Sequence, residues 1–203
     1  MAVHSTAKKR GGPDKRDRIL KAAVKVFAKN GFYATRVSEI AKAAGVADGT
    51  IYLYFKNKDD VLITIFEDGI QQLLAILREV AAAEEPFEAR IKRIIELQLG
   101  LLEDQRDLAE VITVNLRQSS TLLKQYAAPL FMEYIDVIAG LIREGQKQGA
   151  FRKDVNARVA ARSLFGALDA ILLTWALGEA DPASLRKAAS HCASLFLDGL
   201  RTH

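Results

Sequence analysis

Apolar residues recur with the period of an amphipathic helix along nearly the whole chain, and this pattern limits the fold more than any other feature. Alternating apolar and polar runs bounded by turn residues, which indicate β-strands, are missing. The chain has only four prolines, Pro13, Pro86, Pro129 and Pro182, and three of them stand where helices would begin or end. The sequence therefore predicts an all-α protein.

Glycines, prolines and short polar segments divide this pattern into successive helices. The expected helices cover residues 14–30, 36–44, 48–55, 59–83, 86–103, 107–118, 123–148, 155–177 and 183–200. We expect a flexible basic arm over 1–13, a compact three-helix head over 14–57 and a larger helical bundle over 58–203.

Composition limits the class of protein further. Hydrophobic residues make up 50% of the chain and charged residues 27%, so a packed core is expected. The uncharged stretch 170–178 is shorter than the roughly 20 apolar residues of a membrane-spanning helix, and no apolar run follows the basic residues 8–10. Cys192 is the only cysteine, so no intrachain disulfide can form. We expect a cytoplasmic protein with no membrane partner.

The net charge of +4 is distributed unevenly. Residues 1–60 contain 13 Lys and Arg against 6 Asp and Glu, whereas residues 61–203 contain 16 against 19. A basic head on a slightly acidic body suggests that the head binds a polyanion. A non-specific nucleoid protein would carry its basic charge along the whole chain, so this distribution argues against that class.

The segment RVSEIAKAAGVADGTIYLYF, residues 36–55, predicts a helix-turn-helix. Ala41 and Ala44 allow two helices to cross closely, and Gly45 accepts the backbone conformation that reverses the chain. Ile51 then holds the second helix over the first. The exposed face of that second helix carries short or aromatic residues, which can enter a DNA major groove with the N-terminal end first.

The longer segment YATRVSEIAKAAGVADGTIYLYFKNKDDVL resembles the DNA-binding signature of TetR-family transcriptional regulators. The flanking segments RILKAAVKVFAKNGF and DDVLITIFED extend the resemblance over about residues 14–70. It implies a homodimer in which each subunit presents one helix-turn-helix to half of a palindromic operator in double-stranded DNA.

The resemblance also implies which residues contact DNA. Gly49 and Thr50 would approach base edges, and Asp48 would accept from a cytosine amino group or simply stabilise the first helical turn. One of the tyrosines that follow could instead pack in the core. The side chains expected at phosphates lie at helix starts or just after the recognition helix: Thr35, Arg36, Ser38, Tyr52, Tyr54 and Lys58.

Small residues alternate with bulky ones at helical spacing in the last two expected helices, 155–177 and 183–200. Such helices fit a four-helix interface between two subunits, although an intrachain core would explain part of the same pattern. The other body helices carry Leu, Ile and Phe on more than one face. Periodicity alone does not distinguish a filled core from the effector pocket that the family has in this region.

Three further segments resemble the acyl-CoA-responsive fatty-acid-degradation subgroup of the family: ITVNLRQSS (112–120), REGQKQGAFRKDVN (143–156) and FGALDAILLTW (165–175). This resemblance implies a repressor of fatty-acid-degradation genes that long-chain acyl-CoA releases from DNA. The acyl chain needs an apolar tunnel, and the phosphates of coenzyme A need cations at its mouth. Arg106 could equally be a solvated loop residue. The expected ligand-binding residues are Arg106, Leu108, Asn115, Arg117, Gln118, Phe131, Tyr134, Phe165 and Trp175.

We expect neither an enzyme nor a cofactor or metal. The chain has no GxSxG, HExxH, GxGxxG or P-loop pattern, and its three histidines lack the spacing of metal ligands. Cys192 follows His191, but adjacent residues on a helix point in different directions. A family member that responds to a different hydrophobic molecule, such as a repressor of an efflux pump, remains the alternative. Few inward acids can be identified in the body, which favours an aliphatic ligand.

Overall fold

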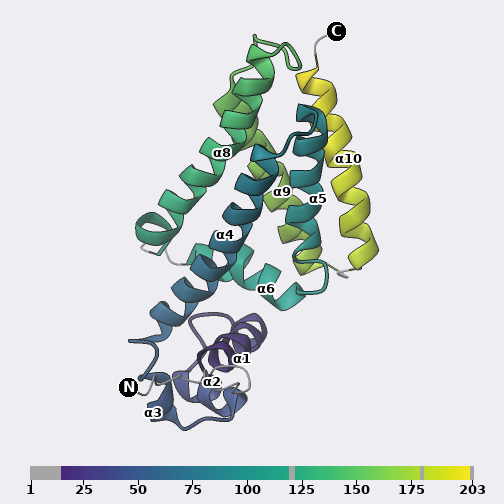
Figure 1. Cartoon of the computed structure of the whole chain (residues 1–203). Helices are drawn as coiled ribbons and strands as arrows, with labels where there is room; N and C mark the ends of the chain where they lie inside the picture. Colours follow the sequence, from purple (N-terminus) through teal and green to yellow (C-terminus); the bar gives the residue numbers. More distant parts are fainter. Residues whose placement is uncertain (1–14, 119–121, 179–180, 202–203) are drawn as a thin grey trace, which may run out of the picture.

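The computed structural model describes residues 15–118, 122–178 and 181–201, which form a small helical head below a larger helical body (Figure 1). The head contains α1 (Lys15–Asn30), α2 (Val37–Ala44) and α3 (Asp48–Ile51). The body contains α4 (Lys58–Ala82), α5 (Phe87–Gly100), α6 (Arg106–Glu110), α8 (Ala128–Lys147), α9 (Ala157–Leu177) and α10 (Pro182–Leu200). In these parts of the chain the only β-type pairing is one isolated bridge, Phe151 with Arg201. The all-α prediction is confirmed.

The longest helix, α4, joins the two parts. It packs against α1 at the head and against α5 and α8 in the body. Asn57 caps its start by accepting a hydrogen bond from the backbone N–H of Asp60 at 2.8 Å, and the Asp60 carboxylate accepts one from the backbone N–H of Lys56 at 2.8 Å. With 25 residues, α4 spans about 37 Å. A single helix therefore reaches from the head into the body.

Three expected helices differ from the observed ones. The helix expected over 48–55 ends at Ile51, because Leu53 and Tyr54 donate to carbonyls three residues back rather than four. The helix expected over 107–118 is regular only in α6 and continues as a π-helix, η1 (Val111–Asn115), and a 3-10 turn, η2 (Leu116–Gln118). The helix expected over 123–148 begins with a π-helical segment, η3 (Leu123–Ala127), just before Pro129, which has no N–H to donate.

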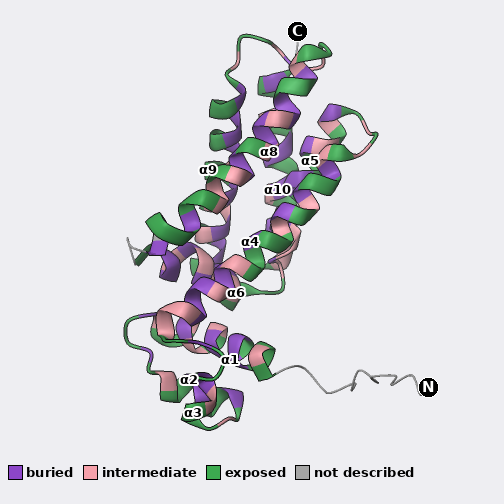
Figure 2. Cartoon of the chain, turned by 60° about the vertical axis from the view of Figure 1, so that its left-hand side comes forward, coloured by how far each residue is buried: buried purple, intermediate pink, exposed green. Residues whose placement is uncertain are grey.

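Buried residues line the inward sides of the body helices (Figure 2). By length and composition α9 could cross a membrane. However, its buried side chains, among them Leu164, Leu168 and Trp175, belong to the core, and the helix packs against α8 and α10. We therefore interpret α9 as the central helix of the bundle.

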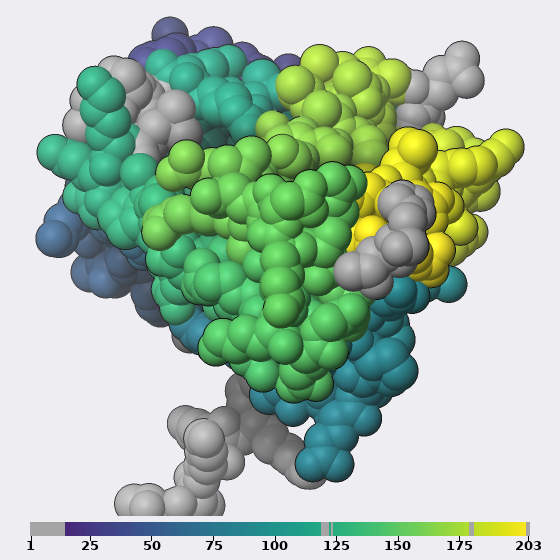
Figure 3. Space-filling view, turned by 90° about the horizontal axis from the view of Figure 1, so that it is seen from above, coloured from purple at the N-terminus to yellow at the C-terminus, as the bar shows by residue number. Residues whose placement is uncertain are grey.

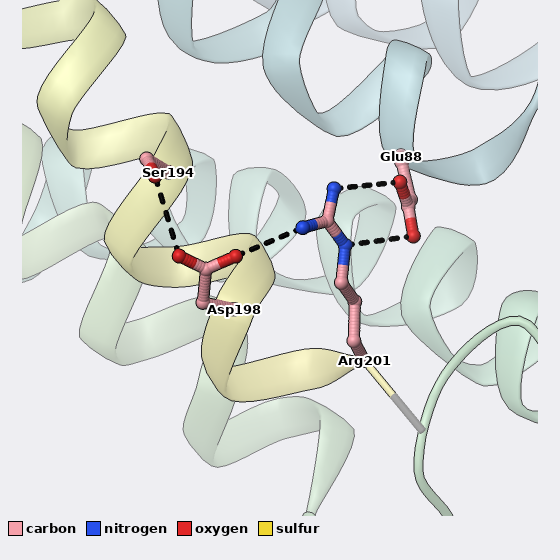
Figure 4. Close-up of polar contacts among 4 residues, drawn as sticks. All are labelled: Glu88, Ser194, Asp198 and Arg201. Atoms are coloured by element: carbon pink, nitrogen blue, oxygen red, sulfur yellow. Dashed lines mark hydrogen bonds and ion pairs between the residues drawn. The ribbon is translucent and has the colours of Figure 1, made fainter. Parts of the chain in front are cut away.

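The end of the body opposite the head is held together by contacts between distant segments. Figure 3 looks down on this end, where α8 and its connection to α9 lie beside α10. Figure 4 shows the guanidinium of Arg201 bonded to both carboxylate oxygens of Glu88, at 3.1 and 3.0 Å, and to Asp198 at 2.9 Å. The Arg201 hydrogen bond lowers the pKa of the Glu88 carboxyl. These contacts fix the C-terminus of α10 to the N-terminus of α5.

Gly145 on α8 is required by close packing at this end of the body. A Cβ atom there would overlap the ring of Phe151 and approach that of Phe87 at 3.2 Å. We expect Gly145→Ala to lower the free energy of unfolding by about 1–3 kcal/mol, because the overpacked rings must move. Urea denaturation measures this change. Gly140→Ala on the same helix, where a Cβ meets no atom within 4 Å, is the control and should be neutral or stabilising. Equal stability of the two variants would contradict the packing argument.

Candidate DNA interface and ligand cavity

The predicted helix-turn-helix is present in the head. Gly45 ends α2 with φ of 65°, and the backbone N–H of Val46 donates to the carbonyl of Ala41 at 3.0 Å. Ile51, the last residue of α3, is buried, and α3 packs against α2. The turn chemistry inferred from Gly45 is therefore confirmed.

Most of the expected DNA-contacting residues lie on the surface of the head. Thr50, a residue of α3, is half-buried. Tyr52 and Tyr54 remain 58% and 40% exposed, so neither is packed in the core. Arg36 begins α2, where its backbone N–H donates to the Glu39 carboxylate at 2.7 Å. The exposed members of the expected set are Arg36, Ser38, Asp48, Gly49, Tyr52 and Tyr54.

Thr35 does not present its side chain to solvent. It is 2% exposed, and its hydroxyl donates to the carbonyl of Gly31 at 2.8 Å. This bond closes the turn between α1 and α2. Gly31 adopts a positive φ of 77° in that turn, a conformation that glycine tolerates. The hydroxyl contact with phosphate that the sequence suggested is not available in this arrangement.

Lys58 is also engaged within the protein. Its ammonium group donates to the carbonyls of Phe32, Tyr33 and Thr35 at 2.8, 3.1 and 2.9 Å, and it lies 4.7 Å from the centre of the Phe32 ring. All three N–H bonds are therefore used. Lys58 thus anchors the start of α4 to the loop between α1 and α2, and the phosphate clamp expected of it stays a prediction.

An apolar cavity lies in the part of the body next to the head. Its volume is about 170 Å³, below the range of about 300–1,000 Å³ common for small-molecule sites, and it opens to solvent. Phe66 from α4, Phe131 from α8 and Phe165 from α9 form a chain of ring contacts with centroid distances of 5.4 and 5.2 Å. The other lining residues are Gly69, Ile70, Gln72, Leu73, Gln98, Leu101, Leu102, Gln105, Leu108, Ile112, Thr113, Arg117, Asp169 and Leu172.

Four of the expected ligand residues line this cavity: Leu108, Arg117, Phe131 and Phe165. Arg117 is ion-paired with Asp169 at 2.6 Å and also donates to the carbonyl of Thr113. The sequence analysis did not select Asp169, although it lies four residues after Phe165 and therefore on the same face of α9. The expectation that the body has few inward acids has to be amended, because this one lines the cavity.

Two expected ligand residues lie deeper than the cavity wall. Tyr134 is fully buried, and its hydroxyl donates to the side-chain oxygen of Gln98 at 2.7 Å, so it positions a residue that does line the cavity. Burial raises the pKa of the Tyr134 hydroxyl, which keeps it neutral. Asn115 is 2% exposed, and its side-chain oxygen has no hydrogen-bond partner among the described residues.

Three other expected ligand residues bond elsewhere and do not line the cavity. Arg106 donates to the carbonyls of Ala176 and Gly178, both at 2.9 Å, and so caps the end of α9. The indole N–H of Trp175 donates to the carbonyl of Asp181 at 2.9 Å. Gln118 accepts a hydrogen bond from the Tyr33 hydroxyl through its backbone carbonyl at 2.9 Å. The partners of Arg106 and Gln118 come from distant segments, so sequence spacing could not reveal them, whereas that of Trp175 lies just before α10.

The role of Lys58 leads to a stability prediction. Lys58→Met keeps the aliphatic chain but leaves three carbonyls without their donor, so we expect the free energy of unfolding to fall by about 1–3 kcal/mol in urea denaturation. Lys56→Met is the matched control, because the Lys56 side chain is exposed and should change stability by less than about 0.5 kcal/mol. If the two variants are equally stable, Lys58 does not anchor the head.

Comparison with known proteins agrees with this arrangement. Residues 19–65 match the family described as bacterial regulatory proteins, tetR family, and residues 66–199 match that described as YsiA-like protein, C-terminal region. The chain is 36% identical over 161 residues to the fatty acid metabolism regulator protein of Bacillus subtilis (strain 168), covering 79% of this chain and 83% of the relative.

Solved structures give the same result. The fatty acid degradation regulator FadR from Bacillus halodurans superposes with a TM-score of 0.85 at 35% identity, covering 96% of this chain and 100% of that one. FadR from Bacillus subtilis in complex with stearoyl-CoA superposes with a TM-score of 0.82 at 33% identity, covering 92% and 99%. These relatives are transcriptional regulators, which agrees with the expectation that the chain is not an enzyme. With a helix-turn-helix head joined by α4 to a body that contains an apolar cavity, the chain belongs to the TetR family of bacterial transcriptional regulators.

Proposed function

We propose that this regulator is a repressor of fatty-acid-degradation genes that binds a palindromic operator as a homodimer and is released by long-chain acyl-CoA. The apolar cavity carries this proposal. Phe66, Gly69 and Ile70 of α4 line it, and the same helix begins at Lys58 in contact with the head. The relative from Bacillus subtilis that was solved with stearoyl-CoA supports a long acyl chain as the occupant.

The energy of acyl burial is sufficient for switching. Burial of a dozen methylenes at about 0.8 kcal/mol each gives a gross gain of about 10 kcal/mol. Moving a two-state protein from about 99:1 to 1:99 requires roughly 5.5 kcal/mol of differential affinity. About half of the gross gain must therefore be specific to the state that does not bind DNA.

The mechanism that we propose operates through α4. An acyl chain between Phe66 and Phe131 separates α4 from α8, and the displaced helix turns the head that Lys58 holds. In a dimer, the two recognition helices then no longer match half-sites that lie about 34–36 Å apart. The exposed apolar side chains Val159 and Leu177 on α9 and Leu195 on α10 support these helices as the dimer interface.

A repressor that responds to another hydrophobic effector is the second candidate. The ion pair of Arg117 with Asp169 in the cavity wall favours it, since a charged group on a hydrophobic ligand could replace one partner of this pair.

Operator release distinguishes the two candidates. A duplex selected from a random-sequence pool by the protein serves as the probe, and fluorescence anisotropy follows its release. We expect palmitoyl-CoA to release the duplex at saturation, whereas free coenzyme A leaves it bound because the apolar cavity stays empty. A duplex that remains bound at saturating palmitoyl-CoA would overturn the acyl-CoA proposal. Release by a hydrophobic cation alone would support the second candidate.

The DNA interface leads to a separate prediction. Tyr52→Phe removes a hydroxyl that is exposed and has no partner in the described parts of the chain. We expect the affinity for the selected duplex to fall about three- to tenfold through the loss of a phosphate contact, with unchanged thermal stability. Tyr126→Phe, at a tyrosine on η3 that is 40% exposed, is the matched control and should bind as the wild type does. An unchanged affinity of the Tyr52 variant would exclude this contact.

A further inference from the structure

The two arginines expected to bind the phosphates of coenzyme A are engaged within the protein. Arg106 caps α9 through the carbonyls of Ala176 and Gly178, and Arg117 is paired with Asp169. An acyl chain in the cavity still carries a headgroup with several phosphates, which must reach solvent and find cations. The opening of the cavity therefore determines where that headgroup lies.

The cavity continues into a groove between α1, α4 and α6. Four residues line both spaces: Gly69, Gln72, Gln105 and Leu108. Gly69, Gln72 and Gln105 are exposed, so this junction is open to solvent. Figure 1 shows α6 directly above α1 at the joint between body and head. A ligand that leaves the cavity here enters a groove with one wall formed by the head.

The wall formed by α1 supplies two free cations. Lys21 and Lys25 are exposed, lie one helical turn apart and line the groove. No ion pair joins either lysine to the residues that the structure describes. At the junction, the amides of Gln72 and Gln105 can bond the amide groups of a pantetheine arm.

The groove also contains carboxylates, and most of them already have partners. Arg16 binds Asp68 at 3.0 Å and lies 3.8 Å from Asp17. Asp107 is the one acid of this groove without an ion pair to a described residue. The phosphates would therefore bind on the lysine side, along α1, and away from α6.

We infer that the groove between α1, α4 and α6 binds the phosphate-bearing headgroup of the thioester ligand through Lys21 and Lys25, while the acyl chain fills the adjoining cavity. This inference rests on the proposed function and deepens it. Because α1 belongs to the head and α6 to the body, one ligand molecule contacts both parts. Headgroup binding then adds a second constraint on the orientation of the head, beside the displacement of α4.

Two ligands separate headgroup binding from acyl binding: palmitoyl-CoA, and S-palmitoyl-pantetheine, which has the same tail and amides but no phosphate. Isothermal titration at about 0.15 M salt, where distant charges are screened, measures both affinities. We expect Lys21→Glu/Lys25→Glu to weaken palmitoyl-CoA binding about tenfold or more, because attraction becomes repulsion, and to change S-palmitoyl-pantetheine binding less than about twofold.

The double variant Lys42→Glu/Lys153→Glu is the matched control, since it makes the same change of net charge at two exposed lysines outside the groove. Both of its affinities should stay within about twofold of the wild type. If charge reversal prevents folding, Lys21→Gln/Lys25→Gln replaces it, with an expected loss of about threefold for palmitoyl-CoA alone.

The outcomes distinguish the two proposals. A groove variant that binds palmitoyl-CoA as tightly as the control variant would overturn the headgroup site and leave the acyl cavity intact. Equal losses for both ligands would also overturn it, because the lysines would then act on the tail or the fold. A wild-type protein that binds neither ligand would instead refute the proposed function.

Discussion

The contact of Lys58 with the loop between α1 and α2 holds the head to the rest of the molecule. One ammonium group satisfies three carbonyls that would otherwise lack a donor, and it does so from the first residue of α4. A neutral side chain at this position could not replace these bonds. Because α4 also lines the cavity, the same helix connects the cavity to the helix-turn-helix head.

The segment that follows α6 departs from regular α-helical geometry and contacts both the cavity and the head. Its backbone passes from π to 3-10 geometry, Arg117 reaches the cavity wall, and the next carbonyl, that of Gln118, accepts from Tyr33 of the head. Asn115 is buried there, and its side-chain oxygen has no hydrogen-bond partner in the described parts of the chain; a buried oxygen left unpaired costs about 1–3 kcal/mol. Such costs persist where the surrounding packing imposes the conformation.

The role of a charged side chain in this protein depends on the groups that lie within its reach. The sequence suggested Arg106, Arg117 and Lys58 as phosphate ligands, yet each is bonded to a carbonyl or carboxylate of the chain itself. The sequence did not indicate a binding role for Lys21 and Lys25, because a lysine on an amphipathic helix is usually a solvated residue. The position of α1 beside α4 and α6 distinguishes them.

The sequence by itself determined the helical class, the start of α4 at Lys58 to within one residue and the reversal at Gly45, because these depend on local periodicity and backbone preferences. It also identified Leu108, Phe131 and Phe165, since large apolar residues on several faces indicate surfaces that pack or enclose. Only the tertiary structure decided that Thr35 and Lys58 point inward, that Trp175 and Arg106 lie outside the cavity and that Asp169 lies in its wall. A hydrogen-bonding side chain takes its role from the partner it meets, and for Lys58 and Arg106 those partners lie on other segments, which only the packing of the helices brings within reach.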